Sequence, residues 1–341
     1  MATIAASFAQ VSPNYMMPDT LVPYTQASGA FELLAEGGPL VRLSDGDLYV
    51  YMKRIDIRTR VAAGQSAYNQ LPGVAFALGQ ISAPTYLLRC RAEYDHHDTA
   101  AMARWGISIV EAHRLGMRSA IFQIMRNGLL YGFNPTNGEG LLNTPGATMI
   151  PLPPDSNNGD TVVTYDPGQM AFFIIGQISA IKSRTNQLGI GRKFVIVGPQ
   201  RSLGALEYQN IVQLTSYQRT GAGSASTKGV IKDVLEMNDD DIIWGYDDTL
   251  IGKGAGGADA IILCMPEVEQ PKGQNSINTN EFAKLTPSAQ ACTLMLCDMA
   301  APREIPVPLA GGAIDVLAEL RTTSGWAVRP EAVTIISMQY S

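Results

Sequence analysis

The sequence DHHDTAAMARWGISIVEAHRLGMRSAIFQIMRNGLLYG, residues 95–132, carries the clearest secondary-structure signal in the chain. Apolar residues recur in it at helical spacing, at Met102, Trp105, Ile109, Met117, Ile121, Ile124 and Met125. Asp95 and Asp98 favour a helix start, and Asn127-Gly128 is a stop signal. The stretch therefore predicts one long amphipathic helix, in which Gly106 and Gly116 indicate a gentle bend or the close approach of another backbone.

Two segments before this helix alternate between two faces, as half-buried strands do. In the first, Ile55, Ile57, Thr59 and Val61 alternate with Arg54, Asp56, Arg58 and Arg60. In the second, Tyr86, Leu88, Cys90, Ala92 and Tyr94 alternate with Leu87, Arg89, Arg91 and Glu93. Residues 65–84, rich in Gly, Ala, Pro and Gln, are expected to form the turn between them.

These strands predict a projecting hairpin. A two-stranded ribbon alone is only marginally stable in water, so this one should lie on another surface. Its arginine face favours an acidic or polar partner, and a solvated basic face is the alternative. Residues 1–46 have little helical periodicity and contain Pro13, Pro18, Pro23 and the break at Gly37-Gly38-Pro39, so we expect an extended arm that also needs a neighbour.

The amino-acid composition indicates a globular protein. With 341 residues, 46% hydrophobic and 16% charged, it can bury a large core and hold two or more domains. The net charge of −6 argues against a sequence-specific nucleic-acid binder. We expect neither a membrane span nor a secretion signal, because no apolar run is long enough to span a bilayer and MATIAASFAQ lacks a basic start. Cys90, Cys264, Cys292 and Cys297 form no CxxC pair and are expected to be reduced core residues.

The middle of the chain, residues 150–310, predicts an α/β unit. Asp166-Pro167 starts a helix whose apolar face is Met170, Ile174, Ile178 and Ile181, and which is expected to extend toward Gly189. A buried strand is expected at 193–197, a helix at 200–208, a helix capped by Ser226, and strands at 242–244 and 260–265.

Motifs for catalysis or cofactor binding are weak. Gly252 to Gly257 (GKGAGG) matches the dinucleotide pattern G-x-G-x-x-G, but a strand follows it, which favours a loop between strands. His96-His97 lacks a second ligand cluster for a metal, and no nucleophile elbow is present in the sequence. The acidic residues 239–241, 247 and 248 favour a solvated face, with divalent-ion binding at a subunit contact as the alternative. We therefore expect no catalytic residue, no cofactor, no metal and no enzymatic activity.

A loop rich in Gly and Asn, NGLLYGFNPTNGEGLLNTPG (127–146), follows the long helix, and the chain ends in AELRTTSGWAVRPEAVTIISMQY (318–340). A hairpin, a long helix, this loop and these closing strands, in this order, resemble the major capsid proteins of tailed phages, which have the Hong Kong 97-type fold. The resemblance implies an α+β fold. Its parts would be an N-terminal arm (1–46), an extended-loop hairpin (47–94), a spine helix with a peripheral domain (95–149), an α/β axial domain (150–310), and C-terminal strands that return to the peripheral domain (311–341).

The same resemblance implies a function. The chain would assemble with itself, as hexamers and pentamers, into an icosahedral shell around double-stranded DNA. Its other partners would be a portal protein and separate scaffolding and decoration proteins, and the DNA contact would be non-specific. The protein would be made in the bacterial host cytoplasm and reside in the virion. The inferred assembly contacts are Arg54, Arg58, Arg60, Arg89, Arg91, Gly138, Glu139, Gly140 and Asn143.

Two alternatives stay open at this point. An encapsulin-like compartment shell has the same fold but encloses a cargo protein instead of a genome. A soluble α/β enzyme would use the strand-helix alternation between Lys193 and Met265.

Overall fold

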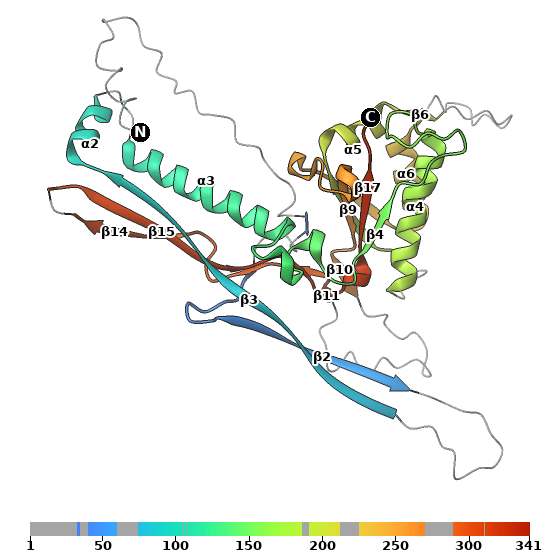
Figure 1. Ribbon diagram of the computed structural model, residues 1–341, viewed down its shortest axis with the longest axis horizontal. Helices are drawn as coiled ribbons and strands as arrows, with labels where there is room; N and C mark the ends of the chain where they lie inside the picture. Colours follow the sequence, from blue (N-terminus) through green and yellow to red (C-terminus); the bar gives the residue numbers. More distant parts are fainter. Residues whose placement is uncertain are drawn as a thin grey trace, which may run out of the picture.

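The computed structural model describes residues 33–34, 40–59, 74–104, 106, 108–185, 191–211, 225–269, 289–309 and 311–341. Most of the predicted arm and Arg60 lie outside this part of the chain. The molecule is elongated (Figure 1). An α/β unit with helices α4, α5 and α6 lies at one end, a long helix lies along a sheet at the other, and a two-stranded ribbon projects away from both.

The first sheet is built around one long strand. Its strands, in spatial order, are β1 (Leu40–Val41), β13 (Leu296–Cys297), β15 (Ile314–Thr323), β3 (Val74–Tyr94) and β2 (Tyr49–Thr59), and β14 (Arg303–Pro308) also pairs with β15. Strand β3 is 21 residues long and changes partner along its length. Its part from Thr85 to Tyr94 pairs with β15, and its part from Val74 to Pro84 pairs with β2.

The predicted hairpin is therefore present, but the expected turn at 65–84 is wrong for its second half. Residues 74–84 belong to β3 and pair antiparallel with β2 from Tyr49 opposite Pro84 to Thr59 opposite Val74. Glycine and alanine have low strand propensity, which hid this segment, and backbone pairing with β2 outweighs that preference.

The expectation of a single long helix is also wrong. The stretch forms α2 (His96–Ala103) and α3 (Ile109–Leu130). Gly106 lies between them with φ 69°, a left-handed conformation that a continuing helix cannot contain. Ser108 then starts α3 by accepting a hydrogen bond from the Glu111 N–H. Gly116 lies within the continuous helix, and the close approach of another backbone expected there is wrong, because nothing lies within 4 Å of a Cβ built on it.

Helix α3 covers one face of the first sheet. Met117, Ile121 and Met125 are buried against alternate residues of β3 and β15, among them Ala92 and Ala318. The predicted apolar stripe is thus confirmed at its centre. The alternation predicted for residues 86–94 is confirmed as well, because the even positions face this core and the odd positions are exposed.

The second sheet belongs to the α/β unit. Its order is β4 (Thr148–Pro151), β17 (Val333–Met338), β9 (Asp259–Cys264), β5 (Lys193–Gly198) and β8 (Asp241–Tyr246). The helices are α4 (Pro167–Arg184), α5 (Gln200–Tyr208) and α6 (Thr227–Glu236). The predicted caps are confirmed: Asp166 accepts from the Gln169 N–H and Ser226 from the Gly229 N–H. Helix α4 ends at Arg184, short of the expected Gly189, with Thr185 as its C-cap.

This sheet joins the two halves of the molecule, because each of its faces belongs to a different core. Val195, Val197 and Ile262 face the core that contains α3. Phe194 and Leu263, one position along the same strands, face the core that contains α4, α5 and α6. The period of two along a strand produces this division.

The C-terminal strands divide between the two sheets, which corrects the expectation that residues 311–341 all return to the peripheral part. Strand β15 pairs with β3, but β17 lies between β4 and β9 in the second sheet. All six residues of β17 are buried, as in a strand covered on both faces, whereas β15 alternates and needs cover on one face.

The remaining short elements connect these units. They are β6 (Asn210–Ile211), β7 (Ala225–Ser226), β10 (Glu267–Glu269), β11 (Ala289–Ala291), β12 (Thr293–Leu294), β16 (Trp326–Ala327) and short 3-10 turns at Pro135–Asn137, Leu141–Asn143, Asp248–Leu250, Ala255–Gly257 and Pro330–Ala332. Of the helices that the structure describes, none is both long enough and apolar enough to cross a membrane.

Candidate assembly surfaces

The ribbon formed by β2 and residues 74–84 of β3 exposes apolar side chains. Tyr49 and Tyr51 lie on one face of β2, with ring centroids 6.2 Å apart, and Leu78 lies on the same face of β3. The exposed fractions are 56% for Tyr49, 61% for Tyr51 and 82% for Leu78. We call these three residues the ribbon face. From Thr85 to Tyr94, α3 covers the same side of β3 that carries Leu78. In the described part of the chain, nothing covers this side before Thr85.

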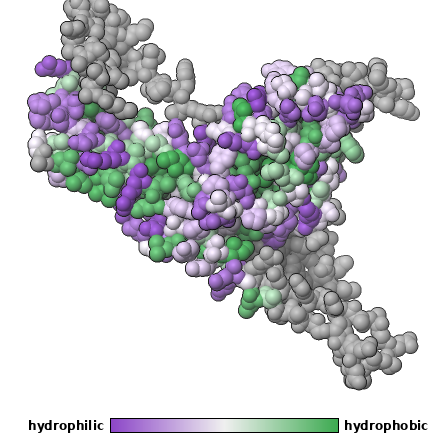
Figure 2. All heavy atoms as spheres, viewed as in Figure 1, coloured by the Kyte–Doolittle hydropathy of each residue, from purple (hydrophilic) through white to green (hydrophobic). Residues whose placement is uncertain are grey.

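Helix α3 carries a second set of exposed apolar side chains. Leu115 and Phe122 are exposed on one flank of the buried stripe of α3, and Ile124 is exposed on its other flank. Figure 2 shows hydrophobic side chains gathered in the half of the molecule that contains α3 and its sheet, interrupted by hydrophilic ones. Exposed apolar patches on a protein surface are typical of sites where another surface docks.

The arginines predicted to contact a neighbour find acidic partners within the chain. Arg91 Nε lies 2.8 Å from Asp315 Oδ2, and Arg89 Nε lies 3.5 Å from Glu319 Oε2, both on β15. The hydrogen bond and charge of Asp315 raise the pKa of Arg91. Both arginines are therefore paired within the chain while their side chains stay 60% and 58% exposed, and their role as assembly contacts stays a prediction. Arg54 and Arg58 lie in β2, and their side chains are outside the described residues.

Glu139, in the loop after α3, is buried and connects three segments. Its Oε1 accepts a hydrogen bond from the Tyr86 hydroxyl at 2.7 Å, and its Oε2 accepts from the Ser324 hydroxyl at 2.6 Å and from the Asn134 N–H at 3.0 Å. Burial of the phenol, together with the Glu139 hydrogen bond and charge, raises the pKa of Tyr86 to about 12. The hydrogen bonds of Glu139 are therefore made to residues of its own chain.

Gly140 is equally internal. Its φ of 86° and ψ of 151° are accessible in practice only to glycine, and an added Cβ would lie 2.3 Å from the Gly132 nitrogen. Its N–H donates to the Gly325 carbonyl at 2.9 Å. Of the four predicted loop residues, Gly138 is half-buried and Asn143 is exposed while donating from its side chain to the Tyr131 carbonyl at 2.9 Å. Only these two reach the surface of the loop.

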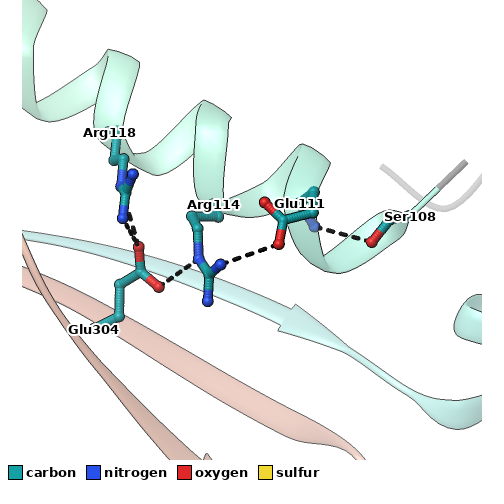
Figure 3. Close-up of polar contacts among 5 residues, drawn as sticks. All are labelled: Ser108, Glu111, Arg114, Arg118 and Glu304. Carbon is teal, nitrogen blue, oxygen red and sulfur yellow. Dashed lines mark hydrogen bonds and ion pairs between the residues drawn. The ribbon is translucent and has the colours of Figure 1, made fainter.

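A charged cluster fastens α3 to the edge strand β14 (Figure 3). Glu304 on β14 accepts from Arg114 at 2.6 Å and lies 3.1 Å from Arg118, and Arg114 also lies 3.0 Å from Glu111. The hydrogen bond and charge of Glu304 raise the pKa of Arg114. Sequence reasoning missed Glu304, Tyr86 and Ser324 as partners, because their contacts depend on pairing between distant strands.

The acidic residues near the end of α6 do not act as one cluster. Asp240 is buried, and both of its carboxylate oxygens lie 2.8 Å from Lys182 Nζ. His96 and His97 are exposed with ring centroids 3.9 Å apart. In the part of the chain with described side chains, no group of three or more His, Cys, Asp or Glu residues could hold a metal ion. The GKGAGG segment is a loop before β9, as predicted.

No protein-family model and no curated protein matches this sequence. Solved structures do match. The capsid of the Myoviridae phage XM1 aligns with a TM-score of 0.66 over 95% of this chain and 96% of that one, at 10% identity. The chain has the phage capsid fold.

The likeness covers nearly the whole length in other structures too. The capsid of the cyanophage P-SCSP1u aligns with a TM-score of 0.54 over 96% of this chain and 93% of that one, at 12% identity. A structure from Gordonia phage Cozz aligns with a TM-score of 0.54 over 98% and 94%, at 15% identity. The resemblance to the Hong Kong 97-type fold, drawn from the order of elements, is confirmed.

Proposed function

We propose that the chain is the major capsid protein of a tailed phage and that copies of it assemble into an icosahedral shell around double-stranded DNA. The observation that carries this proposal is the capsid fold over 95% of the chain in the comparison with phage XM1. In this reading α3 is the spine helix, the β2–β3 ribbon is the extended loop, and the second sheet with its helices is the axial domain.

The exposed ribbon supports assembly on physical grounds. Two strands alone are marginally stable, and this ribbon exposes Tyr51 and Leu78 to water. Each Å² of apolar surface removed from water contributes roughly 25 cal/mol. A second copy that covers the ribbon face would therefore stabilise both the ribbon and the contact. The assembly contacts in this proposal are the ribbon face and four residues from the sequence analysis: Arg54 and Arg58 in β2, and Gly138 and Asn143 in the loop after α3.

Further partners follow from the same proposal. Hexamers and pentamers of the chain would close the shell, a portal protein would occupy one opening, and separate scaffolding or decoration proteins would act on it. The protein would reside in the virion, after synthesis in the host cytoplasm, and would carry out no enzymatic reaction. A net charge of −6 suits weak, non-specific contact with packaged DNA.

Sedimentation velocity of the purified chain tests the proposal. We expect rings or shells far heavier than the 36.6 kDa subunit. The double variant Tyr51→Glu with Leu78→Lys should remain folded, because both side chains are exposed, and should fail to assemble. The matched control is Tyr51→Phe with Leu78→Met, which keeps the ribbon face apolar and should assemble normally. Equal assembly of both double variants would contradict a role for this face.

The contents of the particles separate the alternatives. Nuclease-resistant DNA in particles from infected cells supports a phage capsid, and an enclosed protein supports a compartment shell. A chain that stays monomeric and binds a small ligand saturably would favour the soluble enzyme.

A further inference from the structure

The base of the ribbon, where β3 leaves the sheet covered by α3, is held on both of its faces. On the side of α3, the Tyr86 hydroxyl donates to Glu139, and the Tyr86 ring packs on Phe133 with centroids 4.9 Å apart. In the backbone of the next residue, the Thr85 N–H donates to the Leu48 carbonyl at 3.0 Å. This is the place where any change in the direction of the ribbon would have to occur.

Arg321 of β15 holds the base from the face opposite Tyr86, because it lies beside Leu87 in the register of β15 with β3. Its Nη1 donates to the Asp47 carbonyl at 3.1 Å and to the Thr85 hydroxyl at 3.3 Å, and the Thr85 hydroxyl donates to the same Asp47 carbonyl at 2.6 Å. Asp47, two residues before β2, and the middle of β3 are thereby tied to β15. These bonds are partly buried, so water competes for them less than at an open surface.

Glu139 joins this base to two other parts of the chain. Besides Tyr86, it binds Ser324, in the turn after β15, and the Asn134 N–H, in the loop after α3. Glu139 is 8% exposed and Ser324 is 4% exposed. A buried carboxylate that loses a donor is costly, so each of the three segments restrains the other two.

We propose that Tyr86, Glu139 and Ser324 form a ribbon mount, a set of positioning residues that holds the ribbon at one angle to the sheet under α3. The inference rests on the proposed function for its biological meaning, since a fixed angle lets the ribbon face meet the same surface on every copy. The geometry itself does not depend on assembly. Without the mount, only the hydrogen bonds of Thr85 and Arg321 restrain the base, so the angle of the ribbon varies more while the sheet and helices stay folded.

The distance between two spin labels measures this angle directly. Gln80→Cys places one label on the ribbon and Gln123→Cys places the other on α3, and both positions are exposed. A Cys90→Ser background removes the half-buried thiol, and Cys264, Cys292 and Cys297 are buried. Unassembled subunits are first isolated by size-exclusion chromatography. Pulsed electron paramagnetic resonance then gives the distribution of distances between the two labels.

We expect one narrow distribution for the labelled parent and a broader or shifted one for Tyr86→Phe and for Glu139→Gln. Tyr86→Phe removes only a hydroxyl and keeps the ring on Phe133, so the subunit should still fold. Glu139→Gln keeps the size of the side chain but places an amide N–H₂ against one of the donors that bind the carboxylate. Circular dichroism should match the parent for both variants.

Ser202→Ala is the matched control, because Ser202 also donates from a buried hydroxyl to a buried carboxylate, that of Asp259, at 2.6 Å. It should lower stability and leave the ribbon distance unchanged. Distributions for Tyr86→Phe and Glu139→Gln as narrow as the parent would overturn the proposal, and so would equal broadening in Ser202→Ala. Absence of shells in every variant, parent included, would contradict the capsid function and leave the distance result standing on its own.

Discussion

The Glu304 carboxylate on β14 lies 2.6 Å from the Arg114 guanidinium on α3, although 190 residues separate them in the sequence. The side chain of Glu304 is 17% exposed and that of Arg114 is 40% exposed. This pair, extended by Arg118, fixes the long helix to the edge of the first sheet over the apolar contacts below it. We therefore predict that charge as well as packing holds α3 in its orientation.

Glu304→Gln should lower the midpoint of urea unfolding, because two arginines then face each other without the carboxylate between them. The loss should shrink at high salt, which screens the remaining repulsion. Lys232→Gln is the control: it breaks an exposed pair with Glu236 within α6, which contributes about 0.3 to 0.5 kcal/mol. Equal midpoints for Glu304→Gln and the parent would mean that packing alone fixes α3.

Two glycine-to-alanine substitutions should change the free energy of unfolding in opposite directions. Gly140→Ala should destabilise by roughly 1 to 3 kcal/mol from backbone strain alone, with the clash against the Gly132 nitrogen adding to it. Gly116→Ala should stabilise by about 0.5 to 1 kcal/mol, since it lies within α3 with nothing within 4 Å of the new Cβ. Thermal unfolding of both variants checks this, and a stabilising Gly140→Ala would refute the placement of that loop.

The free energy of unfolding should fall at acidic pH, in part because the Asp259 carboxylate becomes protonated. Burial alone would raise the pKa of this carboxyl, but hydrogen bonds from Arg201, Ser202 and the Gly252 N–H outweigh burial and lower it below its usual value. A lowered folded pKa contributes stability that is present above the unfolded value of about 3.9 and is lost as pH falls through the folded pKa.

The matching measurement is the free energy of unfolding of the parent and of Asp259→Asn from pH 7 down to pH 2. The variant should be less stable at pH 7 and should lose less on acidification. Parallel curves for the two proteins would show that Asp259 does not contribute to acid unfolding.

Local signals in the sequence predicted much of the fold. The Asp166 and Ser226 caps mark helix starts by chemistry within three residues, and the stripe of Met170, Ile174, Ile178 and Ile181 follows the helical period, so α4 and α6 could be placed without tertiary information. The break at Gly106 could not. A glycine inside an amphipathic pattern is compatible with a helix or a stop, and the difference depends on how α2 and α3 pack.

Contacts between distant strands were beyond reach for a different reason. The arginines of β3 looked like a basic face because their partners, Asp315 and Glu319, are more than 200 residues away in sequence and meet them only through the register of β3 with β15. Reversing Arg89 and Arg91 to Glu would place like charges against this chain's own β15. That change would test the sheet instead of assembly, so the ribbon face is the better target.

We propose that the chain builds a shell in which the ribbon of one copy lies on the next. Cryo-electron microscopy of the purified, expressed chain tests it most directly. We expect closed icosahedral particles or their hexamer and pentamer building blocks, in which Tyr49, Tyr51 and Leu78 are covered by an adjacent subunit. A single 36.6 kDa species at every concentration, with no particles on the grid, would contradict it.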